Sequence, residues 1–192
     1  MSLAKRVDGI VTDLGLRREF QVVPMREGTL PAASADDLAA YHADVEVLWR
    51  TIEATRATLT DELRRVGAMA DVLGRTSIEP GDLEGRVAGL RERLLDLRHD
   101  FLGNDKRENA GDPGPVSVMG RFRYAYSSPR FSSHGPTQTQ RASLDIARNR
   151  LAEMVPVLQR ISDEERPALE AAMDAAGAPW TPGRAIPSPG RR

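Results

Sequence analysis

Arginine and aromatic residues alternate in one short segment, Arg121-Phe122-Arg123-Tyr124-Ala125-Tyr126, which is followed by Arg130 and Phe131. Guanidinium groups and aromatic rings together can stack on bases, sugars or a protein surface. The segment therefore predicts a binding site, whose candidate residues are Arg121, Phe122, Tyr124 and Arg130. The alternative is a short amphipathic helix that buries Phe122 and Tyr126 against the rest of the protein and leaves its arginines in water.

Candidates for acid–base catalysis are few. Glycoside hydrolysis needs two carboxyl groups roughly 5–10 Å apart in a cleft, and only Glu62 and the pair Glu164-Glu165 are worth testing for that role. A solvated or ion-paired carboxylate is the alternative for all three. The histidines, His42, His99 and His134, are far apart in sequence, and no phosphate-binding loop or nucleophile elbow is present. We assign no catalytic residue, no metal and no cofactor.

The composition fits one ordinary domain of 192 residues, or one domain with a small appendage. Hydrophobic residues make up 40% of the chain and aromatic residues only 5%, which favours a core of packed helices. The 27 Lys and Arg nearly balance the 28 Asp and Glu, which argues against a nucleic-acid binder. There is no cysteine, no run of about 20 apolar residues that could span a membrane and no apolar secretion signal. These features assign the protein to no particular cellular compartment.

The first thirty residues differ from the rest of the chain. Ser2–Val11 and Arg18–Met25 are short β-branched runs joined by Asp13-Leu14-Gly15, and they predict a two-stranded hairpin. Because an isolated hairpin is marginal in water, we interpret residues 1–30 as the remnant of a larger β-domain.

Residues 31–178 have the apolar periodicity of long helices. Ser34 is a predicted N-cap, and a seven-residue repeat then continues to Leu73, with Thr55 and Glu62 interrupting it and Gly67 predicting a bend or frayed segment. After Pro80, a second helix has a regular apolar seam and ends at Gly103-Asn104; its seam residues are Leu83, Val87, Leu90, Leu94, Leu97 and Phe101.

A long polar loop, residues 104–136, separates these helices from a third. Within it, Val118, Met119, Phe122 and Tyr126 predict one face of a short helix after Pro115. Thr137 and Gln140 form a predicted capping box, and Pro156 predicts a kink near Ala152. A further helical stretch is expected from about Asp163, and residues 179–192 form a Pro-rich tail that we expect to be disordered, with Trp180 holding the chain end to the helices.

Three apolar seams cannot all face water, because each exposed Leu forgoes about 1.5–3 kcal/mol of burial. Short connections favour antiparallel neighbours. The predicted fold is therefore mainly α: an antiparallel, coiled-coil-like bundle of three to four helices, preceded by a short N-terminal β-hairpin. The surplus length of the first helix would be covered by the hairpin, by the 104–136 segment or by another molecule.

Two C-terminal stretches resemble a known family. They are Gly135-Pro136-Thr137-Gln138-Thr139-Gln140-Arg141, and Pro167-Ala168-Leu169-Glu170 continuing to the run from Ala175 to Arg184. Both are similar to the C-terminal region of bacterial sortilin-like propeller proteins, which carry neuraminidase-type (BNR) repeats and are commonly labelled glycosyl hydrolases. The run from Ser2 to Gly9 and the run from Phe20 to Met25 also resemble the last strands of the small β-sandwich that precedes this region in that family.

The resemblance implies a setting for the chain but no catalytic residue. In such proteins the propeller would house the substrate site, and none of its repeats occurs here. We therefore expect a non-catalytic structural or interaction module. Its partner would be either a second copy of the chain, in a homodimer, or the propeller or β-sandwich of a parent chain. The family that the chain resembles is often exported. The alternative is a glycosidase-related protein or a glycan-binding module that uses the 104–136 segment; we expect no nucleic-acid partner and no membrane span.

Overall fold

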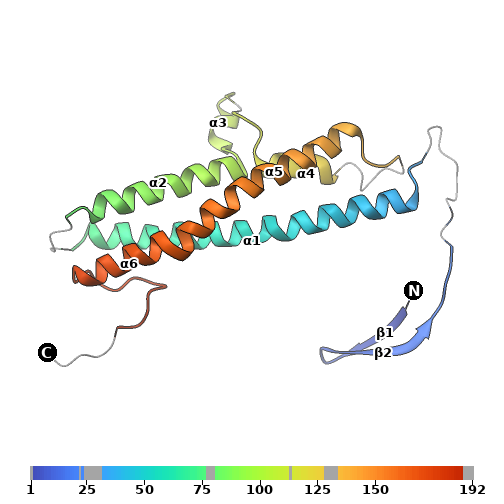
Figure 1. Cartoon of the computed structure of the whole chain (residues 1–192), viewed down its shortest axis with the longest axis horizontal. Coiled ribbons are helices and arrows are strands. Elements are labelled where there is room, and N and C mark those ends of the chain that lie inside the picture. Colours follow the sequence, from blue (N-terminus) through green and yellow to red (C-terminus); the bar gives the residue numbers. More distant parts are fainter. Residues whose placement is uncertain are drawn as a thin grey trace. The chain divides into compact units, whose positions relative to one another are not determined.

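The computed structural model describes residues 2–21, 23, 32–76, 81–112, 114–127 and 134–187. They divide into two compact units, residues 1–32 and 33–192 (Figure 1). The first unit contains a two-stranded antiparallel hairpin, and the second contains the helices. The predicted fold class, a mainly helical bundle with a short N-terminal hairpin, is confirmed.

The hairpin joins β1 (Ser2–Val7) to β2 (Ile10–Arg17), and its turn is at Asp8-Gly9. The predicted turn at Asp13-Leu14-Gly15 is wrong, because these residues form a bulge within β2 and the predicted second strand is displaced. Asp8 and Gly9 both have positive φ, 50° and 82°, which a tight hairpin turn requires and which an Asp-Gly pair adopts readily. Gly15, with φ 66°, supplies the freedom that the bulge needs.

The first long helix, α1 (Ala35–Leu73), begins and ends where the sequence predicted. The Ser34 hydroxyl accepts a hydrogen bond from the amide of Asp37 at 3.0 Å. The helix is continuous through Gly67 without fraying, because the buried side chains of Val66 and Met69 anchor it on both sides. Its buried face is the predicted heptad seam: Tyr41, Val45, Leu48, Ile52, Thr55, Leu59, Glu62, Val66, Met69 and Leu73.

The second helix, α2 (Leu83–Leu102), runs back along α1 (Figure 1). It ends at Gly103, whose φ of 93° suits glycine and whose amide donates to the carbonyl of His99 at 2.8 Å. The short α3 (Asp105–Asn109) and then α4 (Val118–Ser127) follow. The α4 helix packs against α5 (Gln138–Arg160) and the end of α2, and it also reaches α1. The α4 helix, which lies within the predicted 104–136 segment, therefore covers part of the surplus length of α1.

The last helical segment consists of α5, the π-turn η2 (Ile161–Glu165) and α6 (Arg166–Ala175), and it runs in the same direction as α1 (Figure 1). The predicted capping box is present, since Gln140 N donates to Thr137 Oγ1 at 3.2 Å and Thr137 N to Gln140 Oε1 at 2.7 Å. Pro156 lies inside α5 without ending it. The kink near Ala152 stays a prediction.

The π-turn explains why no separate helix begins near Asp163. The amide of Arg166 bonds five residues back, to the carbonyl of Ile161. The carbonyl of Ser162, which a regular α-helix would pair with that amide, instead accepts from Nη2 of the Arg166 side chain at 2.8 Å. One arginine thus supplies both donors at the π-turn, where the helix is locally underwound.

The C-terminal segment is ordered as far as residue 187, so the expectation of a disordered tail is wrong for that part; residues 188–192 lie outside the described residues. Thr181 and Arg184 are buried, while Trp180 is 48% exposed. Arg184 Nη1 donates to the carbonyl of Pro179 at 3.0 Å, and Arg65 of α1 donates to the carbonyl of Gly183 at 3.2 Å. Arg184 also forms an ion pair with Asp174 of α6. Composition does not predict this attachment, because it depends on a buried arginine that pairs with a residue of the preceding helix.

Candidate functional site

The structure places three of the four residues that the sequence singled out in different surroundings. Phe122 is buried, Arg121 is half-buried with an Nε that makes no hydrogen bond, and Tyr124 is 50% exposed. Arg130 lies outside the described residues, as does Phe131. On α4, Ala125 takes the buried position predicted for Tyr126, whose ring instead lies at the surface and is 40% exposed.

Phe122 forms the middle of an aromatic column with Trp49 and Tyr126. The Trp49 and Phe122 ring centroids are 5.4 Å apart with an interplanar angle of 20°. The Phe122 and Tyr126 centroids are 5.8 Å apart at 10°. The two outer rings are partly exposed, Trp49 by 43% and Tyr126 by 40%, so a ligand can reach them but not Phe122.

Sequence reasoning missed Trp49. Its position in the sequence could have indicated a role, because a large aromatic residue directly after the seam residue Leu48 lies on the flank of the buried seam rather than within it. The hydroxyl of Tyr41 adds a second link between the same two helices, because it donates to the carbonyl of Ala125 at 2.9 Å. Together these contacts fix where α4 lies along α1.

A small pocket of about 230 Å³, which we call the aromatic pocket, lies beside the ring of Tyr126. Its other lining residues are His42, Val45 and Glu46, which are successive on one flank of α1. Val45 is buried and gives the pocket an apolar floor, whereas His42 and Glu46 are exposed. Within the described part of the chain, Glu46 takes part in no ion pair.

A buried charge cluster, Glu62–Arg166–Glu170, connects α1 to α6. Arg166 Nε donates to Glu62 Oε1 at 3.0 Å, and Arg166 Nη1 lies 2.9 Å from Glu170 Oε2. The side chains are only 4%, 13% and 16% exposed, in chain order. Two carboxylates held on one guanidinium give a structural ion-pair network rather than an acid and a base facing a substrate.

Burial determines the ionisation of this cluster. It raises the pKa of Glu62, and the charge and hydrogen bond of Arg166 only partly oppose that effect. Burial also works to lower the pKa of Arg166, but the hydrogen bond and charge of Glu170, together with those of Glu62, outweigh it and raise the pKa. Arg166 is therefore a permanent cation, and burial opposes the negative charge of Glu62.

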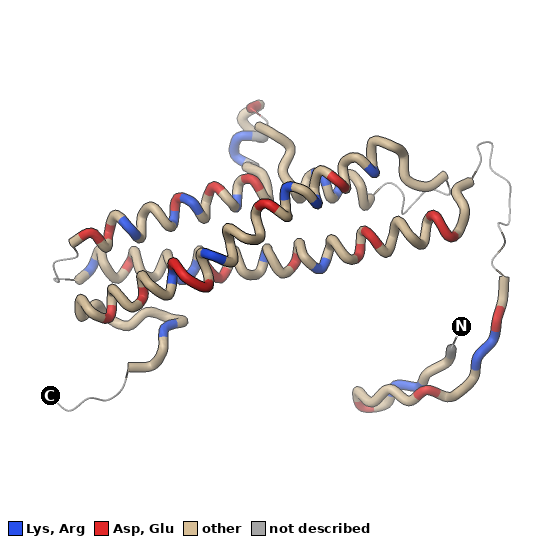
Figure 2. The backbone as a smooth tube through the Cα atoms, in the orientation of Figure 1, with Lys and Arg blue, Asp and Glu red and all other residues tan. Residues whose placement is uncertain are grey.

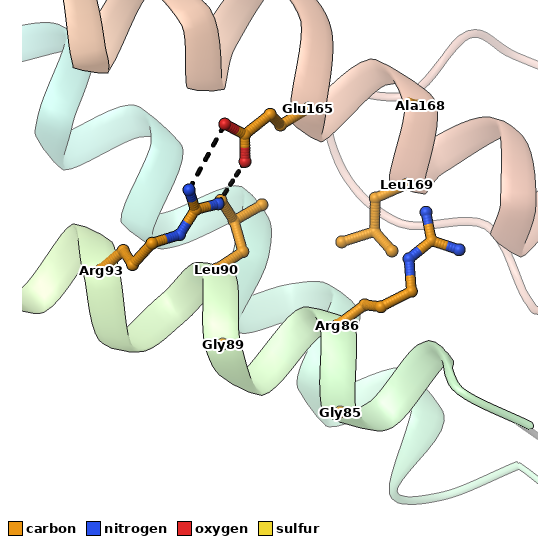
Figure 3. A pocket seen from close by; sticks show the side chains of 8 residues that line it. All are labelled: Gly85, Arg86, Gly89, Leu90, Arg93, Glu165, Ala168 and Leu169. Atoms are coloured by element: carbon orange, nitrogen blue, oxygen red, sulfur yellow. Dashed lines mark hydrogen bonds and ion pairs between the residues drawn. The ribbon is translucent and has the colours of Figure 1, made fainter.

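A larger groove of about 650 Å³ lies between α2 and α6 (Figure 3). Gly85 and Gly89 expose the backbone of α2, and Leu90 and Leu169 give apolar walls. The paired side chains of Arg93 and Glu165 cross the groove. The hydrogen bond from Arg93 lowers the pKa of Glu165, against an opposing effect of burial.

Neither Glu164 nor Glu165 has the geometry of a hydrolase carboxylate. Glu164 is exposed, and Glu165 is engaged by Arg93. Among the described residues, no three His, Cys, Asp or Glu side chains converge on a position where they could hold a metal ion. None of the helices in the described ranges combines the length and apolar character that a bilayer crossing requires. Basic and acidic residues are interspersed along the sequences of α1, α2 and α5, as the blue and red segments of the tube in Figure 2 show.

Comparison of the sequence with protein-family models found no match, and comparisons with curated proteins and with solved structures found none either.

Proposed function

We propose that this chain is a non-catalytic helical module that attaches to a β-sheet of a larger protein through its N-terminal hairpin. The observation that carries the proposal is a set of paired, exposed apolar side chains on the hairpin. Leu3 pairs with Leu16, and Val7 with Ile10, across the two strands. Because Leu3, Lys5 and Val7 alternate along β1, both apolar pairs lie on the same face. All four side chains are about half exposed or more: 51%, 60%, 49% and 71%.

A two-stranded hairpin needs further strands or a packing surface to be stable in water. A second copy of the hairpin would not provide this packing surface. Four apolar residues on each hairpin would bury far less than the roughly 1,200 Å² of a specific protein interface. A larger sheet would both pair with a free strand edge and cover the apolar face. The helical bundle needs no such cover, since its core seams are already buried against one another.

The family resemblance supports the same attachment. It implies that the acceptor is the β-sandwich of a sortilin-like, BNR-repeat parent protein, with any glycosidase activity in the propeller of that parent. The ion pairs of Glu62 and Glu165 support a structural rather than a catalytic role for the carboxylates of this chain.

Amide hydrogen exchange on the purified chain tests the hairpin proposal. We expect the amides of Val7 and Ile10 to exchange within about ten-fold of unprotected rates, while those of Ile52 and Leu94 are protected by the full stability of the bundle. Hairpin amides protected to the same extent as those of Ile52 would show a self-sufficient hairpin and refute the proposal.

The acceptor can be sought directly. If a sheet domain is encoded in frame upstream, fusing it to the chain should protect the hairpin amides. Replacing both Val7 and Ile10 by Lys should abolish that protection, whereas Lys5→Gln, between the apolar pairs, should preserve it. Protection that survives the double replacement would exclude the apolar face as the attachment surface.

A glycan-binding module is the second candidate, and the exposed rings of Tyr124 and Tyr126 on α4 favour it. Neutral oligosaccharides should then perturb the tyrosine signals at millimolar concentration. The related hypothesis of glycosidase activity predicts that the chain hydrolyses at least one of a set of glycosides. That activity should be lost when Glu62, Glu164 or Glu165 is replaced. No binding and no turnover would reject both.

A further inference from the structure

The aromatic pocket combines a ring face, an apolar floor and a carboxylate in a small volume. Tyr126 supplies the ring, Val45 the floor and Glu46 the carboxylate, in a space of about 230 Å³. Drug-sized ligands occupy pockets of roughly 300–1,000 Å³, so this pocket suits a single side chain or a small functional group. The aromatic column behind it keeps the ring in place, because Tyr126 stacks on the buried Phe122.

Several acidic residues of α1 have arginine partners. Asp44 lies 3.8 Å from Arg148, Glu53 pairs with Arg56 at 2.5 Å, and Asp61 with Arg65 at 2.6 Å. Glu46 has no such partner within the described residues. A carboxylate beside the face of an aromatic ring attracts an organic cation by charge and by the ring quadrupole together.

We propose that the aromatic pocket binds the guanidinium or ammonium group of a basic side chain on a partner protein. The partly exposed Trp49 and Tyr126 support a protein partner, because Trp, Tyr and Arg dominate the residues that carry binding energy at protein interfaces. This contact lies on the bundle, does not rest on the hairpin proposal and is tested separately from it.

The test is an NMR titration of the full-length protein with N-acetyl-arginine amide. The chain has three histidines, so comparison with His42→Gln assigns the imidazole signal of His42, which lines the pocket. We expect a saturable shift of that signal at millimolar concentration. N-acetyl-citrulline amide, which has nearly the same shape but no charge, should give no saturable shift.

Substitutions identify the groups responsible. Glu46→Gln should weaken arginine binding about two- to five-fold, the range for an exposed charge contact, and added salt should weaken it further. Tyr126→Leu should remove saturable binding, and Tyr126→Phe, which keeps the ring, should retain it. Tyr124→Leu is the matched control, because Tyr124 is also exposed on α4 but does not line the pocket.

Three results would overturn the proposal. One is an equal response to the arginine and citrulline compounds, and another is the absence of saturable binding by wild-type protein. The third is a response to methyl glucoside without one to arginine, which would identify a carbohydrate site instead. Circular dichroism of each variant separates loss of binding from loss of fold.

Discussion

Replacing Arg166 with Met removes the cation from the buried Glu62–Arg166–Glu170 cluster. Glu62, whose side chain is 4% exposed, would keep its charge in the interior without a partner. Breaking a buried pair in this way costs about 3–5 kcal/mol of unfolding free energy. The Ser162 carbonyl also loses the 2.8 Å hydrogen bond that compensates the π-turn, which adds about 1 kcal/mol.

The pH dependence distinguishes this mechanism from simple loss of packing. Because burial raises the folded-state pKa of Glu62 above its ordinary value of 4.5, its contribution to stability is fully present below that value. The contribution is lost as the pH rises through the folded pKa. Without Arg166 the folded pKa rises further, so the destabilisation should be small at about pH 4 and reach its full value near pH 7.

Urea denaturation at several pH values measures this effect, with the slope of the transition checked for two-state behaviour. Arg148→Met is the matched control, because the Arg148 side chain is 42% exposed and its ion-pair partners within the described residues, Asp44 and Asp145, are exposed carboxylates. This replacement should cost less than about 1 kcal/mol. Adding Glu62→Leu to Arg166→Met should restore most of the lost stability. A loss below about 1 kcal/mol at pH 7, or one that is independent of pH, would refute the reasoning.

Three further predictions concern the groove and the C-terminal segment. Ala at Gly85 or Gly89 should raise the unfolding free energy by about 0.5–1 kcal/mol each, because an added Cβ meets nothing within 4 Å; lower denaturation midpoints would contradict this. Glu165→Gln should cost at most about 1 kcal/mol at pH 7 in urea denaturation, since Arg93 is half exposed. The pKa of Glu165 is lowered in the folded protein, so the loss of stability caused by this replacement should shrink as the pH falls through that pKa. A loss that grows in acid would contradict the prediction. Arg184→Ala should cost about 1–3 kcal/mol by thermal denaturation and expose residues 179–187 to limited proteolysis, and an unchanged cleavage pattern would argue against Arg184 as the anchor.

Local signals predicted most of the helical architecture. The seven-residue repeat of α1, the capping box of Thr137 and Gln140, and the glycine stop at Gly103 were all readable because each depends on residues within one or two turns. The position of the hairpin turn was predicted wrongly, although Asp8-Gly9 is a typical turn sequence. The Asp13-Leu14-Gly15 segment also resembles a turn, but it forms a bulge instead.

The candidate site was only partly predictable. The short helix that contains Phe122 followed from its apolar spacing, but the stacking of Phe122 between Trp49 and Tyr126 joins residues 73 positions apart in the chain. Likewise Glu62 was recognised as unusual within its helix, whereas its partner Arg166 is 104 residues away. Such contacts depend on how the helices pack, which local periodicity does not specify.

The sequence by itself determined that the described chain would form long amphipathic helices with buried seams and a short hairpin, because periodicity and capping are properties of neighbouring residues. Only the tertiary structure decided which charges are paired and which are free. Glu62 and Glu165 have arginine partners from other elements, while Glu46 has none within the described residues and stands beside the ring of Tyr126. The physical reason is that the ion pairs of Glu62 and Glu165 and the pocket beside Tyr126 each join two elements, which only the helix packing brings together.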